Sequence, residues 1–256
     1  MQLADLNILW PALLAGLLVL STHVPLGQVV LKRGIIFIDI AVAQIAGMGV
    51  IAAEQFGWEA EGWTVQLAAG LSALLAAMLF NLCEKFWPEI LEALIGIAFV
   101  LASSGSILLL AGNPHGGEHL KDLLVGQILW VSGDALMHTA ILYALVLACW
   151  FLLRDRMGRI GFYALFALAV TASVQLVGVY LVFASLIVPA LAVRRCGERW
   201  RLPLAYAIGI AGYAGGLALS FIYDLPTGAV TVWSLAVVGA ASMLLCRKAA
   251  SPAVAA

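Results

Sequence analysis

The sequence predicts an all-α fold, a polytopic bundle of membrane-spanning helices. Of its 256 residues, 64% are hydrophobic and 11% are charged, and the mean hydropathy is +1.07. A soluble domain is about half apolar and one quarter charged. Apolar runs such as 8–31 and 64–83 are near the roughly 20 residues that cross a bilayer, and none alternates like a barrel strand. The chain is therefore expected to satisfy its backbone within helices inside a membrane.

Polar breaks divide the chain into about nine candidate helices. In chain order they are 8–31, 35–53, 63–83, 90–111, 132–153, 160–176, 177–193, 203–223 and 229–246. The stretch 160–193 is too long for one crossing and barely long enough for two, and Gln175 and Gly178 are its obvious break. A bundle of eight helices therefore stays open as an alternative. Gly212 and Gly216, at small-xxx-small spacing, predict close packing of 203–223 on another helix.

The distribution of basic residues predicts the orientation. With the N-terminus outside, Lys121 is the single basic residue of the outer loops, and all other Lys and Arg residues fall in inner loops. The inner residues are Lys32, Arg33, Lys85, Arg154, Arg156, Arg159, Arg194, Arg195, Arg199, Arg201, Arg247 and Lys248. The C-terminus is then cytoplasmic. One transmembrane permease domain is expected over 1–248, followed by a short tail over 249–256.

The termini and cysteines give two further expectations. Residues 1–7 contain Asp5 and no Lys or Arg, so they lack the basic front of a cleavable signal peptide and the first helix is expected to stay. The four cysteines have no C-x-x-C spacing and fall near cytoplasmic helix ends, so they are expected to be reduced thiols.

Several classes of function lack their signatures. The net charge is −1 without a polybasic or acidic tail, which gives no sign of a nucleic-acid partner. No phosphate-binding G-x-x-x-x-G-K-[ST] loop is present, and neither is an HExxH or GxSxG motif. The chain is therefore not expected to be an enzyme or to bind a cofactor. Energy for any transport would come from a partner subunit or from a gradient.

Three polar side chains inside predicted helices are candidate ion ligands. Asp39 is an acid in a membrane helix, where burial is expensive, so it is a functional-site hypothesis by default. The alternative is that it is hydrated or pairs with Lys32 or Arg33. Gln44 is either an interhelical hydrogen-bond partner or a ligand. His23 either lines a cation path or is a neutral histidine bonded to a backbone carbonyl.

Two outer groups have metal-like composition. The segment 113–119 places His115, Glu118 and His119 together on a Gly-Gly turn, where nitrogen and oxygen ligands could meet zinc. An ordinary polar loop is the alternative. Asp134 and His138 stand one helical turn apart, so they can bond each other or present one cation site.

Ordered motifs from about Leu13 to Cys246 carry a family resemblance. They are Pro25-Leu-Gly27 before Lys32-Arg33, Gly96 after Glu92, Leu123-Leu-Val-Gly126 before Asp134, Gly178-Val-Tyr-Leu-Val182 running into Ile187-Val-Pro189-Ala190, and Asp224-Leu-Pro-Thr-Gly228. In this order they resemble the permease subunits of zinc, manganese and iron ABC importers.

The resemblance implies the partners and the substrate. It implies a homodimeric pore in the bacterial cytoplasmic (inner) membrane, in contact with lipid. An ABC ATPase subunit would bind ATP, and an extracytoplasmic metal-binding protein would deliver the ion. Zinc is the first choice and manganese the second, with iron as a further candidate. The alternative is an ATP-independent metal carrier or channel of the same ancestry.

Two departures separate this sequence from the family pattern. Family members carry Asp followed four residues later by His in the second helix, whereas Gln44 stands here in the His position and Asp39 lies one residue early. At five residues apart, Asp39 and Gln44 are roughly 140° apart around a helix. The family's cytoplasmic segment that docks the ATPase is also shortened here. The resemblance leaves Arg154, Asp155, Arg156 and Arg159 as the contact residues.

Overall fold

A computed structural model of the chain describes residues 3–58, 63–113, 116–153, 156 and 158–249, and these residues form helices joined by short turns. The α-helices are α1 (Leu3–Arg33), α2 (Ile38–Gln55), α3 (Trp63–Phe86), α4 (Leu91–Leu110), α5 (Gly116–Val125), α6 (Gly133–Leu153), α7 (Gly158–Val177), α8 (Val179–Ala192), α9 (Glu198–Tyr223) and α10 (Thr227–Ala249). Short 3-10 helices η1 (Pro88–Ile90) and η2 (Ile128–Trp130) precede α4 and α6.

The prediction of an all-helical membrane bundle is confirmed. Within the described part of the chain, eight helices are long and apolar enough to cross a membrane, and α8 is a shorter apolar helix. All nine candidate helices of the sequence are present. The segment 113–119, which the sequence analysis placed on a Gly-Gly turn, is partly helical, because α5 begins at Gly116.

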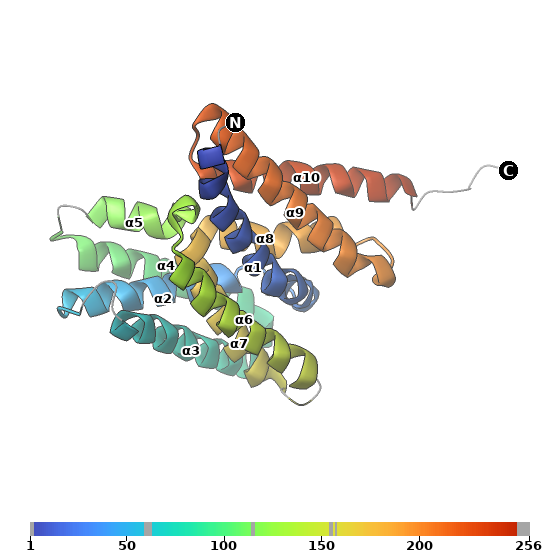
Figure 1. Cartoon of the computed structure of the whole chain (residues 1–256). Coiled ribbons are helices and arrows are strands. Elements are labelled where there is room, and N and C mark those ends of the chain that lie inside the picture. Colours follow the sequence, from blue (N-terminus) through green and yellow to red (C-terminus); the bar gives the residue numbers. More distant parts are fainter. Residues whose placement is uncertain (1–2, 59–62, 114–115, 154–155, 157, 250–256) are drawn as a thin grey trace.

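Helix α1 lies at the centre of the bundle (Figure 1). It packs against α8 and α9 on one side and against α6 and α7 on another. Helix α2 lies between α3 and α4, and α3 also packs on α7. Helices α9 and α10 form an antiparallel pair, in which Gly212 faces Leu235 and Gly216 faces Thr231. The glycine spacing in 203–223 therefore marks a helix contact, as predicted.

A break at Gly178 separates α7 from α8. Gly178 has φ of 79°, a left-handed conformation that glycine adopts without strain. A β-carbon there would overlap the backbone of Gly126, which follows α5 and has φ of 71°. A β-carbon at Gly228, near the start of α10, would overlap the Val125 carbonyl oxygen. The end of α5, the α7–α8 break and the start of α10 are thus packed backbone to backbone.

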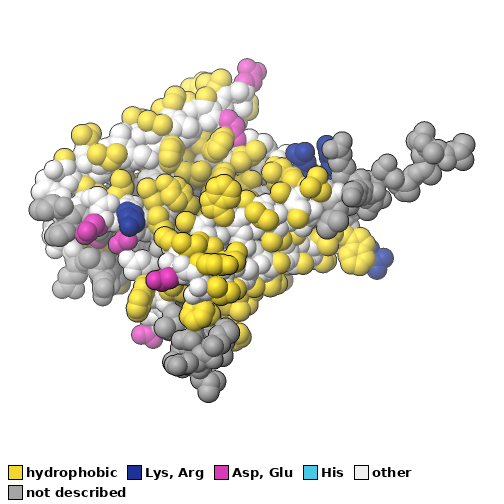
Figure 2. All heavy atoms as spheres, turned by 90° about the horizontal axis from the view of Figure 1, so that it is seen from above, with side chains coloured by type: hydrophobic (Ala, Val, Ile, Leu, Met, Phe, Trp, Pro, Cys, Tyr) yellow, Lys and Arg dark blue, Asp and Glu magenta, His cyan; other side chains and the backbone are white. Residues whose placement is uncertain are grey.

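The outside of the bundle is largely apolar. Figure 2 shows hydrophobic side chains over much of the face in view, with few charged side chains among them. Large exposed side chains such as Leu75, Leu108 and Leu152 lie on the middle and ends of helices α3, α4 and α6. Such a surface suits lipid or a second membrane subunit and would be unstable in water.

Candidate functional site

His23 is fully buried inside the bundle. Its Nδ1 atom lies 3.0 Å from the Val19 carbonyl oxygen and 3.0 Å from the Thr22 hydroxyl. Its Nε2 atom is also buried, and no hydrogen-bond partner for it is found among the described residues. The bond to a backbone carbonyl, which the sequence offered as one alternative, is therefore formed by one nitrogen only. The second nitrogen stays available to a proton, a water molecule or a cation.

Tyr143 extends this buried polar group across to α6 and α7. Its hydroxyl forms a hydrogen bond with the Ser173 hydroxyl, and the two lie 3.2 and 2.8 Å from the Ala169 carbonyl oxygen. The Tyr143 hydroxyl also lies beside that of Thr22. Thr22, His23, Tyr143 and Ser173 are each at most 1% exposed. We call these four residues the central polar cluster.

Asp39 is the charged residue buried most deeply in α2. It is 1% exposed, and neither carboxylate oxygen has a hydrogen-bond partner among the residues that the structure describes. The anticipated alternative of an Arg33 pair is not formed. Arg33 instead lies 4.0 Å from Glu84 and over the Phe162 ring at 4.3 Å. A buried carboxylate without a counter-charge is unfavourable, so Asp39 is suited to meet a cation that passes through.

The candidate ligands lie at different depths in the bundle. His23 is ten residues before the end of α1 at Arg33, or about 15 Å along the helix. Asp39 is in the first turn of α2, immediately after the short turn that follows Arg33. Gln44 is also buried, at 7% exposure, but its position is about 140° around α2 from Asp39. Within the described residues, no three His, Cys, Asp or Glu side chains converge on one metal position.

An open groove, which we call the polar groove after the polar side chains in its lining, lies toward the opposite end of the bundle from Lys32 and Arg33. It has a volume of about 990 Å³ and lies between α3, α6 and α7. Its polar lining consists of Gln66, Gln127, Ser132, His138, Thr139, Thr171 and Gln175. Thr139 is one helical turn before Tyr143, and Thr171 is two residues before Ser173. The Thr171 hydroxyl is buried and has no hydrogen-bond partner in the described part of the chain.

The two outer groups predicted from the sequence belong to α5 with the residues just before it and to α6, and the first group is described only in part. His115 lies outside the described residues. Glu118 and His119 fall in the first turn of α5, where Glu118 is exposed. Asp134 and His138 are both exposed on α6, and no hydrogen bond or ion pair joins them in the structure. Only His138 of these residues lines the polar groove.

The connection between α6 and α7 is short. Helix α6 ends at Leu153 and α7 begins at Gly158. Arg154 and Asp155 lie outside the described residues, and Arg156 and Arg159 are exposed. Exposed guanidinium groups at this end can meet a partner protein, although no docking helix precedes α7 among the described residues.

Tyr143, Ser173 and Thr171 were not identified as candidate site residues from the sequence. Their residue types gave little indication of a site, because hydroxyl side chains are common in membrane helices and the free-energy cost of burying them there is small. Thr171 and Gln175, four residues apart in an otherwise apolar run, do mark one polar face of α7. That spacing could have indicated the groove.

The bundle of long apolar helices is that of a polytopic membrane protein. The model of the ABC 3 transport family matches residues 5–162 and 153–246. The chain belongs to this family, and as a permease subunit it is not itself catalytic.

Two solved structures have the same fold. One is PsaBC from Streptococcus pneumoniae in complex with Fab, with 19% identity, a TM-score of 0.76 and coverage of 93% of each chain. The other is an inward-facing conformation of a protein described as a metal-chelate type ABC transporter. It has 19% identity and a TM-score of 0.68, covering 98% of this chain and 90% of that chain.

Proposed function

We propose that this chain is the membrane-spanning subunit of an ATP-driven importer for a divalent metal ion, with zinc as the first candidate and manganese as the second. The observation that carries the proposal is Asp39, a buried carboxylate without a partner in the described residues of a transport-family membrane protein. The metal-chelate description of one matched structure supports a metal substrate. Histidine nitrogen favours zinc, and carboxylate oxygen suits manganese.

The proposed path has three levels. A hydrated ion enters the polar groove, where hydroxyl and amide oxygens and His138 replace part of its water shell. It then passes the central polar cluster, where the Nε2 atom of His23 has a free lone pair in one tautomer. Asp39 supplies the negative charge near the far end. Few ligands at each level keep the affinity low, which transport requires because the ion must leave each position.

The partners follow from family membership. An ABC ATPase subunit would hydrolyse ATP, and an extracytoplasmic metal-binding protein would deliver the ion to the outer end near Glu118. Two copies of this chain would form the pore, in the bacterial cytoplasmic membrane. We place the N-terminus outside, because the basic residues gather at the ends of α1, α3 and α8, which the positive-inside rule assigns to the cytoplasm.

The short α6–α7 connection favours a second candidate, an ATP-independent metal carrier or channel. The test is metal uptake into vesicles that contain this chain alone or with its candidate ATPase, binding protein and ATP. Uptake of zinc or manganese that needs ATP and the partners supports the importer. Uptake by the chain alone supports the carrier. Absence of metal uptake in both preparations, with correctly inserted protein, would contradict both.

A further inference from the structure

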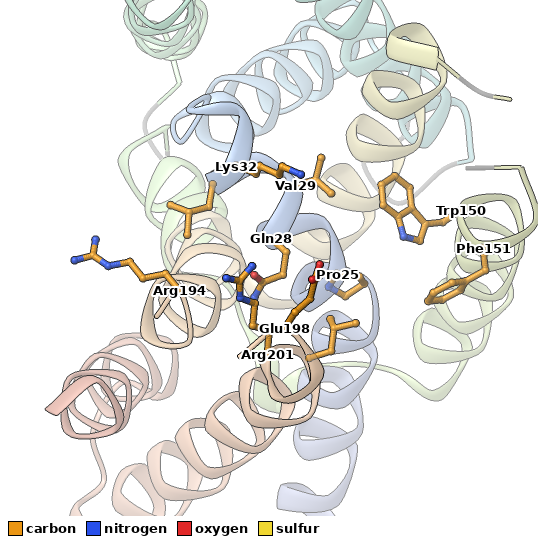
Figure 3. Close-up of a pocket in the computed structure, with 11 residues that line it drawn as sticks. Pro25, Gln28, Val29, Lys32, Trp150, Phe151, Arg194, Glu198 and Arg201 are labelled. Atoms are coloured by element: carbon orange, nitrogen blue, oxygen red, sulfur yellow. The ribbon is translucent and has the colours of Figure 1, made fainter. Parts of the chain in front are cut away.

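A second cavity, of about 470 Å³, lies at the basic end of the bundle and is distinct from the proposed ion path. It is bordered by the last turns of α1, the end of α6, the turn between α8 and α9 and the first turns of α9 (Figure 3). Its polar lining is Gln28, Lys32, Arg194, Glu198 and Arg201. Its volume is within the range of small-molecule sites, roughly 300–1,000 Å³.

The lining carries an excess of positive charge. The lining includes three cationic side chains and one carboxylate, Glu198, and in the part of the chain that the structure describes no ion pair joins them. Arg201 donates from Nε to the Cys196 carbonyl oxygen at 3.1 Å, which holds its guanidinium in place while its terminal nitrogens remain available. A cation such as the proposed substrate would be repelled here, and an anion would be attracted.

Gln28 adds a neutral donor to this cationic lining. Its Nε2 atom is buried, and no acceptor is found for it among the described residues. Figure 3 shows the side chains of Gln28, Glu198 and Arg201 together, with Lys32 and Arg194 farther out. An oxygen-rich anionic group that fills the cavity would accept hydrogen bonds from the amide and from the guanidinium groups.

One border of the cavity is apolar and exposed. Trp150 is buried, whereas Phe151 is 64% exposed and Leu202 is 41% exposed. A cationic pocket bordered by exposed apolar side chains is complementary to an amphipathic anion. Free phosphate would satisfy the charged part only.

We propose that this cavity binds the phosphate headgroup of an anionic phospholipid, with Gln28, Lys32, Arg194 and Arg201 as donors and with the acyl chains along Phe151 and Leu202. Basic pockets between membrane helices are suited to such headgroups. A bound lipid would link α1, α6 and α9. The proposal requires only that the chain spans a membrane and is independent of the transported substrate.

The test is binding to the full-length chain in neutral detergent, measured by native mass spectrometry and by thermal shift. Phosphatidylglycerol, phosphatidylcholine and inorganic phosphate are the three probes. We expect phosphatidylglycerol to bind and to raise the melting temperature, with little effect of the other two. An equal response to phosphatidylcholine would overturn a charge-selective site. Equal stabilisation by inorganic phosphate would overturn the lipid assignment in favour of a phosphate site.

Variants separate the cavity from the general positive charge of this end. Lys32→Gln with Arg194→Gln removes two exposed cations of the lining and should weaken phosphatidylglycerol binding about thirtyfold. The matched control, Arg195→Gln with Arg199→Gln, removes two exposed cations at the same end of the bundle that do not line the cavity. Equal weakening in both double variants would overturn the proposal. Gln28→Leu keeps all charges and removes one donor of the cavity lining. It should also weaken phosphatidylglycerol binding, so it tests the same cavity with a second variant.

Discussion

The backbones of Gly126 and Gly178 lie in direct contact, and both residues have positive φ. This contact joins the end of α5 to the break between α7 and α8. Gly178→Ala would add a β-carbon in a left-handed conformation and also push it into the Gly126 backbone. We expect a loss of about 2–4 kcal/mol in the free energy of unfolding, because backbone strain and overpacking add. Thermal denaturation of the purified chain in detergent measures this change.

Gly197→Ala is the matched control. Gly197 precedes α9 with φ of −58°, and a β-carbon there would meet nothing within 4 Å. We expect its melting temperature to stay close to that of the natural chain. Equal melting temperatures for the two alanine variants would show that the Gly126–Gly178 contact does not hold the break in place.

The length and composition of apolar runs predicted the membrane helices, because each crossing needs a near-continuous apolar stretch. Helix α5 was not predicted from the sequence. It has ten residues, six of them Gly, Glu, His, Lys or Asp, and is too short to be a span. Its end is held by contact with Gly178, 52 residues beyond Gly126. A local pattern cannot encode a contact between segments so far apart in the chain.

The candidate site was predictable only in part. Asp39 and His23 were identified because charged and titratable side chains are rare within membrane helices. The partners of His23 and Asp39 were not predictable. Arg33 is near Asp39 in sequence, yet its ion pair is with Glu84 on α3. Tyr143 and Ser173 are 30 residues apart, and only the packing of α6 on α7 brings their hydroxyl groups together.

The Tyr143–Ser173 hydrogen bond should stabilise the contact between α6 and α7. Tyr143→Phe removes a buried hydroxyl and leaves Ser173 bonded to the Ala169 carbonyl oxygen. We expect a loss of about 1 kcal/mol in the free energy of unfolding, as for a typical buried hydrogen bond. A double-mutant cycle with Ser173→Ala should give a coupling energy of about 0.5–1.5 kcal/mol.

Tyr213→Phe serves as the comparison within the same bundle. The Tyr213 hydroxyl is bonded to Ser185 at 2.8 Å, between α8 and α9, and no hydrogen bond between it and Ser173 is found among the described residues. The effects of Tyr213→Phe and Ser173→Ala on the melting temperature should add in the double variant. If the effects of Tyr143→Phe and Ser173→Ala are also additive, the hydroxyl groups of Tyr143 and Ser173 do not interact.

Asp39→Asn tests the proposed ion path. The amide has nearly the same shape and lacks the negative charge that would compensate a divalent cation in a buried position. We expect uptake to fall at least about tenfold while the melting temperature is retained, because the carboxylate has no ion pair to lose. Radiolabelled zinc and manganese uptake into vesicles measures the change.

Glu89→Gln is the control for Asp39→Asn. Glu89 is an exposed acid of η1, outside the proposed path, so its replacement should leave uptake unchanged. Undiminished uptake by Asp39→Asn would remove this carboxylate from the path. Equal losses in both variants would attribute the effect to overall charge.

The outer histidines test where the ion is first captured. His115→Ala with His119→Ala should raise the metal concentration needed for half-maximal uptake by about tenfold, since two of three nitrogen and oxygen ligands are removed. The maximal rate and the melting temperature should change little, because the residues that form the path are intact. Lys121→Gln, an exposed change on α5 that deletes no metal ligand, should leave this concentration unaltered. An unchanged half-maximal concentration in the double variant would instead leave His138, which lines the groove, as the outer histidine to test next.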